Sequence, residues 1–400
     1  MNDSRLRLLT LSSDLPSQTE HEYISIANES LLGAGLNTWQ DYLRRIGREN
    51  MRIAFDGDRV IGGLGFYRVQ QSFGGRSIPT AGISGVAVDL AERSGGVARQ
   101  MMSETLHELR EEGFPLAGLY ASTQTLYRGV GFEQAGTRLE YELPIRCLPK
   151  PSYPLPCTRF EEAPIDALAQ VASVRAERTN GNLIRTEGLW DRLLFPYNDQ
   201  PCKTYLIGEV ADPQGYVILK AATRHDGLPA VTTATDYAAN TPEAMQRLMA
   251  LLHDQRAMHD RFRWCGGPQD PLLLHSSEAW AEILDIERWL LRILDFRSAI
   301  ESRGYPPGCT GSLDIELTDE LFESNQGRWR IDFCGGRASV QPGGEGTFRL
   351  DVKTLAPLYS SLHSASELAA FGRIQHAAPE EITLADQAFA GPTPWMPEIY

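Results

Sequence analysis

The chain has 400 residues, of which 42% are hydrophobic and 22% are charged, and its formal net charge is −14. This length predicts two or three globular domains. The excess of acidic residues argues against non-specific nucleic-acid binding, which needs basic patches. It is compatible with attraction of cationic small molecules, and equally with a surface that simply keeps the protein in solution.

The sequence contains no pattern that would indicate a membrane span, secretion or a metal site. There is no run of 18 apolar residues, so we expect no membrane span, and the N-terminus does not resemble a signal peptide. The six cysteines are scattered and the eight histidines have no metal-ligand spacing. We therefore expect a cytoplasmic protein with reduced thiols and no bound metal.

In chain order, the first elements are predicted helices over residues 20–37 and 39–46. Apolar runs on either side of Asp56-Gly57-Asp58 then predict a β-hairpin over residues 51–67. Further strands are predicted over residues 83–88, 116–120 and 138–143, with a helix over residues 96–112.

The strand at 83–88, the turn after it and the helix at 96–112 form one unit with a chemical consequence. The first turn of a helix has backbone N–H groups without an internal partner, and the helix dipole makes that end positive. A phosphate is the natural ligand for such a place. Gly95 and Gly96 carry no Cβ, which lets a ligand approach the backbone closely. An ordinary strand-to-helix turn would be the alternative reading of these residues.

The pattern Arg-x-x-Gly-x-Ala at residues 93–98, preceded by Val86-Ala87-Val88, resembles the coenzyme A signature of the GNAT N-acetyltransferases. The order of elements over residues 1–147 also resembles that family. The resemblance implies acetyl-CoA as co-substrate, with its pantetheine arm paired to 86–88 and its pyrophosphate on 94–99. The implied cofactor-binding residues are Val86, Ala87, Val88, Arg93, Ser94, Gly95, Gly96, Val97, Ala98, Arg99, Ser122 and Thr123.

Tyr127 precedes Gly131-Phe132, where GNAT proteins commonly carry a tyrosine that acts as general acid toward the leaving thiolate. By resemblance, Tyr127 is a candidate catalytic residue, whereas Tyr120 belongs to the preceding strand. A phenol with a pKa near 10 suits reprotonation of a thiolate. The alternative is an aromatic side chain of the hydrophobic core.

Residues 149–156 are dense in proline and predict a linker, after which the pattern partly repeats. Helices over 165–174 and 186–194, a hairpin turning at 212–215 and a helix starting at Thr241-Pro242-Glu243 predict a second GNAT-like domain. It lacks the coenzyme A signature, and Pro242 removes an N–H donor where a phosphate would need one. We expect this domain to bind no coenzyme A and to wall the acceptor cleft.

The last part of the chain opens with residues 287–304, whose charges and apolar residues predict an amphipathic helix pair. Strands are predicted over 311–317, 327–333, 338–341 and 346–352, and helices over 354–362 and 366–371. The block 328–360 resembles the sterol-carrier-like C-terminal domain of the enhanced intracellular survival (Eis) acetyltransferases. Fold alone does not establish lipid binding.

The chain ends in Trp395-Met396-Pro397-Glu398-Ile399-Tyr400, which is too apolar for a typical free tail. In the Eis family the terminal carboxylate lies in the active site and deprotonates the amine. The resemblance thus makes the α-carboxylate of Tyr400 a second catalytic candidate. A tail packed on a neighbouring subunit is the alternative.

The chain is therefore expected to be an α+β protein with two tandem GNAT-like α/β domains, each a mixed sheet flanked by helices, and a sterol-carrier-like α+β domain. The expected boundaries are 1–147, 148–285 and 286–400.

The predicted reaction is N-acetylation of a primary amine on an aminoglycoside- or polyamine-like molecule or a lysine side chain. A non-catalytic acyl-CoA or lipid sensor and an interaction protein remain alternatives. Tentative substrate-cleft residues are Glu22, Trp39 and Tyr42, although core packing would also explain Trp39. The resemblance further implies a homo-oligomer, a hexamer in the relatives.

Overall fold

The computed structural model describes residues 6–12, 14–31, 35–93, 95–196, 200–221 and 230–400. The chain forms two compact units. The first contains residues 1–135, 289–391 and Tyr400, and the second contains residues 136–288 and 392–399.

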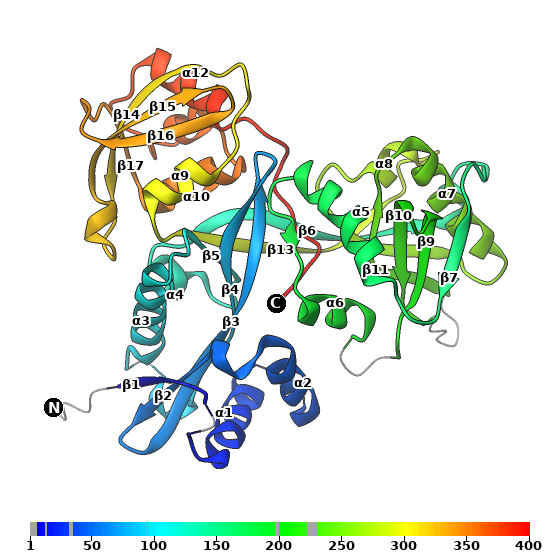
Figure 1. The fold of residues 1–400 in the computed structure, drawn as a ribbon, viewed down its shortest axis with the longest axis horizontal. Helices are drawn as coiled ribbons and strands as arrows, with labels where there is room; N and C mark the ends of the chain where they lie inside the picture. Colours follow the sequence, from blue (N-terminus) through cyan, green and yellow to red (C-terminus); the bar gives the residue numbers. More distant parts are fainter. Residues whose placement is uncertain (1–5, 13, 32–34, 94, 197–199, 222–229) are drawn as a thin grey trace. The chain divides into compact units, whose positions relative to one another are not determined.

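A mixed sheet with the strand order β1-β2-β3-β4-β5-β13 forms the centre of the first unit (Figure 1). Its β4–β5 pair is parallel and its β2–β3 and β3–β4 pairs are antiparallel. The strands are β1 (Arg7–Thr10), β2 (Met51–Asp56), β3 (Arg59–Phe73), β4 (Arg76–Val88), β5 (Leu116–Tyr120) and the part of β13 (Glu282–Ile293) from Trp289 onward. The helices of this part are α1 (Ser17–Ser30), α2 (Leu36–Ile46), α3 (Val97–Glu111) and α4 (Gln124–Arg128).

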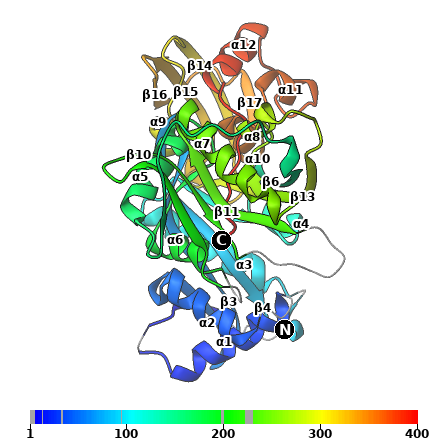
Figure 2. The same ribbon diagram turned by 90° about the vertical axis from the view of Figure 1, so that its right-hand side faces the viewer.

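Helices α1 and α3 cover opposite faces of this sheet. Adjacent strand residues point to opposite faces. A Cβ at Gly62 would lie 3.3 Å from the sulfur of Met101 on α3, whereas a Cβ at the next residue, Gly63, would lie 2.8 Å from the ring of Tyr23 on α1. Figure 2 shows α1 and α2 beside β3 and β4 from a second direction. The glycines of β3 therefore let helices pack closely on both faces.

The predicted hairpin at 51–67 and the strand, turn and helix after it are confirmed, with longer strands than expected. The buried face of α3 consists of Met101, Met102, Leu106 and Leu109. Each such side chain contributes about 1.5–3 kcal/mol through burial. The first predicted helix is shorter than expected, since α1 ends at Ser30; residues 32–34 of that prediction lie outside the described residues.

The predicted helix pair over 287–304 is wrong in its first half. This stretch is the end of β13, in which Trp289–Ile293 pair antiparallel with β5, and only α9 (Phe296–Ser302) is helical. The physical reason is Arg292, which is completely buried and lies 2.6 Å from Asp319. In the sequence, this charged residue among apolar ones resembles the polar face of an amphipathic helix. In the structure it is buried in a strand and paired with an aspartate.

The C-terminal part of the first unit has a separate sheet with the strand order β16-β15-β14-β17. The four strands predicted in this part of the chain are confirmed. They are β14 (Gly311–Thr318), β15 (Gly327–Cys334), β16 (Arg337–Pro342) and β17 (Phe348–Asp351). The helices are α10 (Val352–Ser360), α11 (Ala365–Ala370) and α12 (Pro379–Ala388), of which α12 was not predicted.

The second unit repeats the arrangement of sheet and helices, with the strand order β6-β12-β11-β10-β9-β7. Its strands are β6 (Glu133–Pro144), β7 (Cys157–Phe160), β8 (Leu183–Ile184), β9 (Lys203–Glu209), β10 (Asp212–Leu219), β11 (Val231–Ala239) and β12 (Arg261–Gly266). Its helices are α5 (Ile165–Glu177), α6 (Glu187–Leu194), α7 (Pro242–His253) and α8 (Pro271–His275). The predicted turn at 212–215 is wrong, because β10 already begins at Asp212 and the turn is at 210–211. Among the helices of the described ranges, none is long and apolar enough to cross a bilayer.

Candidate active site

Strand β4 leaves its neighbour β5 before it ends. The parallel ladder joins Thr80–Ile83 to Leu116–Leu119, and β4 then continues along β3 as far as Val88. Alternate backbone groups of 84–88 therefore face the side on which β5 has diverged. An extended ligand that carries amide groups can pair with them as an added strand would.

A bulge at Gly85 bends β4 at the start of this opening. Gly63 pairs with Ala87 but Gly65 pairs with Ser84, so Gly85 and Val86 together face one residue of β3. Gly85 has a φ of +62°, a conformation that glycine adopts without steric penalty.

Two tyrosines of the first helices hold the bulge in place. The Tyr23 hydroxyl donates to the Gly85 carbonyl at 2.8 Å, and the Tyr42 hydroxyl lies 2.9 Å from Ser84 Oγ. A Cβ at Gly85 would lie 2.7 Å from both hydroxyl oxygens. Helices α1 and α2 therefore lie close to β4 here, and no residue larger than glycine fits at position 85.

The turn after β4 leads directly into α3. Gly96 precedes the helix with a φ of +82°, and α3 begins at Val97 with no acidic residue in its first turn. Arg93, Gly95 and Arg99 are exposed there, so cations flank a helix N-terminus that is open to solvent. Ser94, which was predicted to contact the cofactor, lies outside the described residues.

Tyr127 lies on α4 and is packed into the core beneath α3. Its ring makes an edge contact with Phe132 at a centroid distance of 6.2 Å, and only 5% of the residue is exposed. Burial raises the pKa of Tyr127 to about 12, so its hydroxyl is protonated at neutral pH. Ser122 and Thr123, predicted as cofactor contacts, are exposed in the loop before α4.

The last residue of the chain lies on the β4–β5 ladder. Gly82 and Gly118 are registered partners there, and a Cβ at these positions would lie 3.1 Å and 2.7 Å from atoms of the Tyr400 side chain. The ring is 6.3 Å from that of Tyr67 and 6.1 Å from that of Tyr120. The terminal side chain therefore adjoins the point at which β4 and β5 separate.

The tentative cleft residues have different environments. Trp39 is buried and makes edge contacts with Tyr23 and Tyr42, as core packing would require. Glu22 is partly exposed on α1 and accepts a hydrogen bond from Gln18 at 2.8 Å.

Several residues around Tyr400 were missed by the sequence reasoning, notably Tyr67, Gly82 and Gly118. Tyr67 lies 6.4 Å from Tyr42 and so links the rings of α2 to the ring of Tyr400. Glycines inside the strand patterns were the available signal, because glycine in a strand often marks a close approach.

The second GNAT-like domain has a different helix start at the corresponding place. Pro242 occupies the first position of α7, and the Thr241 hydroxyl accepts a hydrogen bond from the Ala244 N–H at 3.1 Å. Glu243 adds a negative charge to the first turn. This helix end is satisfied by its own residues, which does not favour an anionic ligand.

Three family profiles match parts of the chain. Residues 14–135 and residues 181–293 each match an acetyltransferase (GNAT) domain, and residues 296–397 match a sterol carrier protein domain. The tandem GNAT domains and the sterol-carrier-like domain of the predicted fold are therefore confirmed.

Relatives extend over most of the chain. The N-acetyltransferase Eis of Mycobacterium tuberculosis is 27% identical over 339 residues, which is 79% of each chain. An uncharacterized N-acetyltransferase of Streptomyces avermitilis is 28% identical and covers 86% of this chain and 87% of its own. The crystal structure of a GCN5-related N-acetyltransferase from Anabaena variabilis superposes with a TM-score of 0.93 at 30% identity, covering 99% of this chain and all of that one. The chain is an N-acetyltransferase that belongs to the GCN5-related (GNAT) family, of the Eis type.

Proposed function

We propose that this enzyme uses acetyl-CoA and transfers its acetyl group directly to a primary amine of a cationic small molecule, such as an aminoglycoside or polyamine, or of a lysine side chain. The observation that carries the proposal is the divergence of β4 from β5 after Ile83, immediately before the exposed N-terminus of α3. In this assignment 86–88 pair with pantetheine and the turn from Arg93 to Arg99 binds pyrophosphate. Ser122 and Thr123 border the same cofactor.

In the proposed reaction the amine nitrogen attacks the thioester carbonyl, and a backbone N–H near Val86 stabilises the oxyanion. The C–N bond forms, the C–S bond breaks, and the products are an acetamide and the coenzyme A thiol. Tyr127 supplies the proton to the thiolate, and the Tyr400 carboxylate receives the proton that the amine loses.

The raised pKa of Tyr127 supports its role as the acid, but it also requires a desolvated environment for the thiolate. A pKa of about 12 keeps the acid loaded with its proton across the neutral range. A phenol this weak protonates a thiolate readily only where the thiolate is also desolvated, because desolvation raises the pKa of the thiol in turn. We therefore propose that the proton is transferred only when both substrates are bound and the thiolate is shielded from water.

The preference for cationic acceptors is supported by charge and by aromatic surroundings. The net charge of −14 favours approach of cations. The rings of Tyr67 and Tyr120 stand near Tyr400, and aromatic faces attract ammonium groups. An α-carboxylate is a weak base for an ammonium in water, so the acceptor amine must be partly desolvated before it loses its proton.

The function is tested by single-turnover transfer of labelled acetyl to a panel of aminoglycosides, polyamines and lysine peptides, read as thiol release. Calorimetry with acetyl-CoA gives the stoichiometry, for which we expect one cofactor per chain because the second domain lacks the signature. Binding of acetyl-CoA without transfer to any amine would favour a non-catalytic acyl-CoA or lipid sensor. The sterol carrier domain match at 296–397 is the observation behind that second candidate.

We further propose that the enzyme works in the cytoplasm as a homo-oligomer, a hexamer by resemblance, with domain boundaries near residues 147 and 285. Light scattering of the purified full chain measures the assembly.

A further inference from the structure

The C-terminal segment 392–399 is docked in the second unit by backbone hydrogen bonds on two sides. On one side the Thr137 N–H donates to the Pro394 carbonyl at 3.2 Å, and the Met396 N–H donates to the Thr137 carbonyl at 3.3 Å. On the other side the Trp395 N–H donates to the Asn180 carbonyl at 3.0 Å. The segment therefore behaves as a short additional strand rather than a free tail.

This segment lies where β11 and β12 diverge. The parallel ladder between them joins Val231–Thr233 to Arg261–Arg263, after which the two strands separate. A cavity of about 190 Å³ is lined there by residues of both strands together with Pro397, Glu398 and Ile399. The ring of Trp395 covers Gly267, just beyond β12, where a Cβ would lie 2.5 Å from it. In the first unit the corresponding divergence is the candidate cofactor site.

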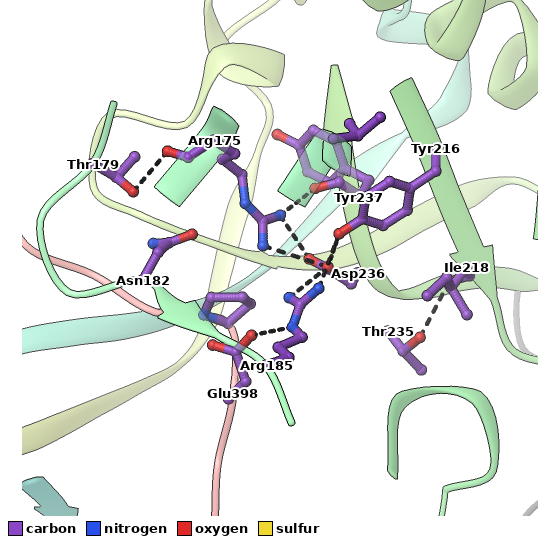
Figure 3. Close-up of polar contacts among 12 residues, drawn as sticks. Arg175, Thr179, Asn182, Arg185, Tyr216, Ile218, Thr235, Asp236, Tyr237 and Glu398 are labelled. Carbon is purple, nitrogen blue, oxygen red and sulfur yellow. Dashed lines mark hydrogen bonds and ion pairs between the residues drawn. The ribbon is translucent and has the colours of Figure 1, made fainter. Parts of the chain in front are cut away.

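Glu398 is anchored to β11 through a buried network, shown in Figure 3. Arg185 Nε donates to Glu398 at 2.5 Å, and another nitrogen of the same guanidinium lies 2.6 Å from Asp236. Arg175 approaches the same aspartate to 2.7 Å, and the Tyr216 hydroxyl also donates to it. One arginine thus connects the tail to the strand.

The side chains of this network are almost completely shielded from water. Arg185 and Asp236 each have 1% of their side chain exposed, and Glu398 has 3%. Burial alone would raise the pKa of the Asp236 carboxyl, but the guanidinium groups of Arg175 and Arg185 outweigh burial and lower it. A carboxylate buried to this degree stays docked only while its cation is present, so loss of Arg185 should release the tail.

We propose that Arg185 is a positioning residue for acetyl transfer: it docks Glu398 in the second unit, and the short chain from Glu398 to Tyr400 then limits how far the terminal carboxylate can move. Tyr400 is two residues beyond Glu398, and two residues span at most about 7 Å. A docked Glu398 therefore confines the chain end to a small volume. This inference rests on the proposed role of the Tyr400 carboxylate.

The first measurement does not depend on activity. Full-length protein is treated with a carboxypeptidase, and release of Tyr400 is followed by mass spectrometry. We expect Arg185→Met to lose Tyr400 at least tenfold faster than the wild type. Glu398→Gln, which leaves the Arg185–Asp236 pair intact, should do the same even if Arg185→Met folds poorly. Arg178→Met removes an exposed arginine of the same unit and is the matched control.

The second measurement distinguishes positioning from a merely structural role. We expect Arg185→Met and Glu398→Gln to lower kcat at least tenfold while KM for acetyl-CoA is unchanged. In chains shortened by Tyr400, the same substitutions should cause no further loss of kcat. Unchanged trimming rates would overturn the docking, and unchanged kcat or additive losses would overturn the positioning. If the wild type transfers no acetyl group, the proposed function fails, and the trimming rates still decide the docking.

Discussion

The hydroxyl of Tyr400 lies against Gly118, so closely that a Cβ at Gly118 would stand 2.7 Å from its oxygen. Gly118 pairs with Gly82 across the β4–β5 ladder, and together the two glycines leave a flat place on the sheet for the terminal ring. Only 8% of Tyr400 is exposed. The last residue of the chain is thus seated on the first sheet at the place where β4 and β5 begin to separate.

Gly118→Ala should displace the Tyr400 ring and with it the terminal carboxylate. We expect kcat to fall at least tenfold, about 1.4 kcal/mol in activation free energy, with little change in KM for acetyl-CoA. Steady-state kinetics check this. Gly308→Ala is the control, because a Cβ there meets nothing within 4 Å. Full activity in Gly118→Ala would show that the position of the terminal ring is unimportant.

Gly85→Ala should disturb the bulge in β4 and weaken acetyl-CoA binding. A new Cβ would collide with the hydroxyls of Tyr23 and Tyr42, in addition to the strain of a φ of +62°. Gly57 has the same φ with open space around it, so Gly57→Ala measures the strain alone, about 1–2 kcal/mol. We expect a clearly larger loss of unfolding free energy in Gly85→Ala, and a raised Kd for acetyl-CoA only in that variant. Equal effects of the two substitutions in urea unfolding and calorimetry would contradict this.

Tyr127→Phe should cut turnover strongly, by about a hundredfold or more, because general acid catalysis typically contributes that much. The ring remains to fill the core, so Tm and acetyl-CoA affinity should stay close to those of the wild type. Because the pKa of Tyr127 is about 12, its ionisation should cause no loss of rate between about pH 7 and pH 10. Tyr305→Phe, which removes another buried hydroxyl in the same unit, is the control. Unchanged turnover in Tyr127→Phe would remove its assigned role.

Asp270 should make the stability of the second unit depend on pH. It is buried, accepts hydrogen bonds from the Tyr237 hydroxyl and the Leu272 N–H, and burial raises its pKa from 3.8 to about 6. Because the folded-state pKa is raised, the protonated form contributes stability that is full below about pH 4 and is lost as pH rises through 6.

Comparison with Asp270→Asn isolates this contribution. The difference in unfolding free energy, wild type minus variant, should fall by on the order of 3 kcal/mol between pH 4 and pH 7. Urea unfolding at several pH values measures it. Parallel pH profiles for the two proteins would mean that Asp270 does not titrate in this window.

Much of the local structure could be predicted because its signals are local. The turn at Gly57, the helix start at Thr241-Pro242, the strand that ends at Val88 and the helix that begins at Val97 each depend on neighbouring residues, and these were predicted correctly. The spacing of apolar residues gave a wrong helix prediction around Arg292, because the buried charge there is paired with an aspartate that is distant in the sequence. Spacing reports which residues avoid water on average, and it cannot reveal that a charged residue has a buried partner elsewhere in the chain.

The sequence by itself determined that a strand, a glycine turn and a helix N-terminus follow one another at 83–109, because helix and strand periodicity and the demands of glycine act over a few residues. It also identified an apolar chain end. Only the tertiary structure decided that Tyr400 would rest on Gly118, that Tyr23 and Tyr42 would hold the bulge at Gly85, and that Arg185 would hold Glu398. Each of these contacts joins residues far apart in the chain, and their proximity is set by the packing of whole sheets and helices.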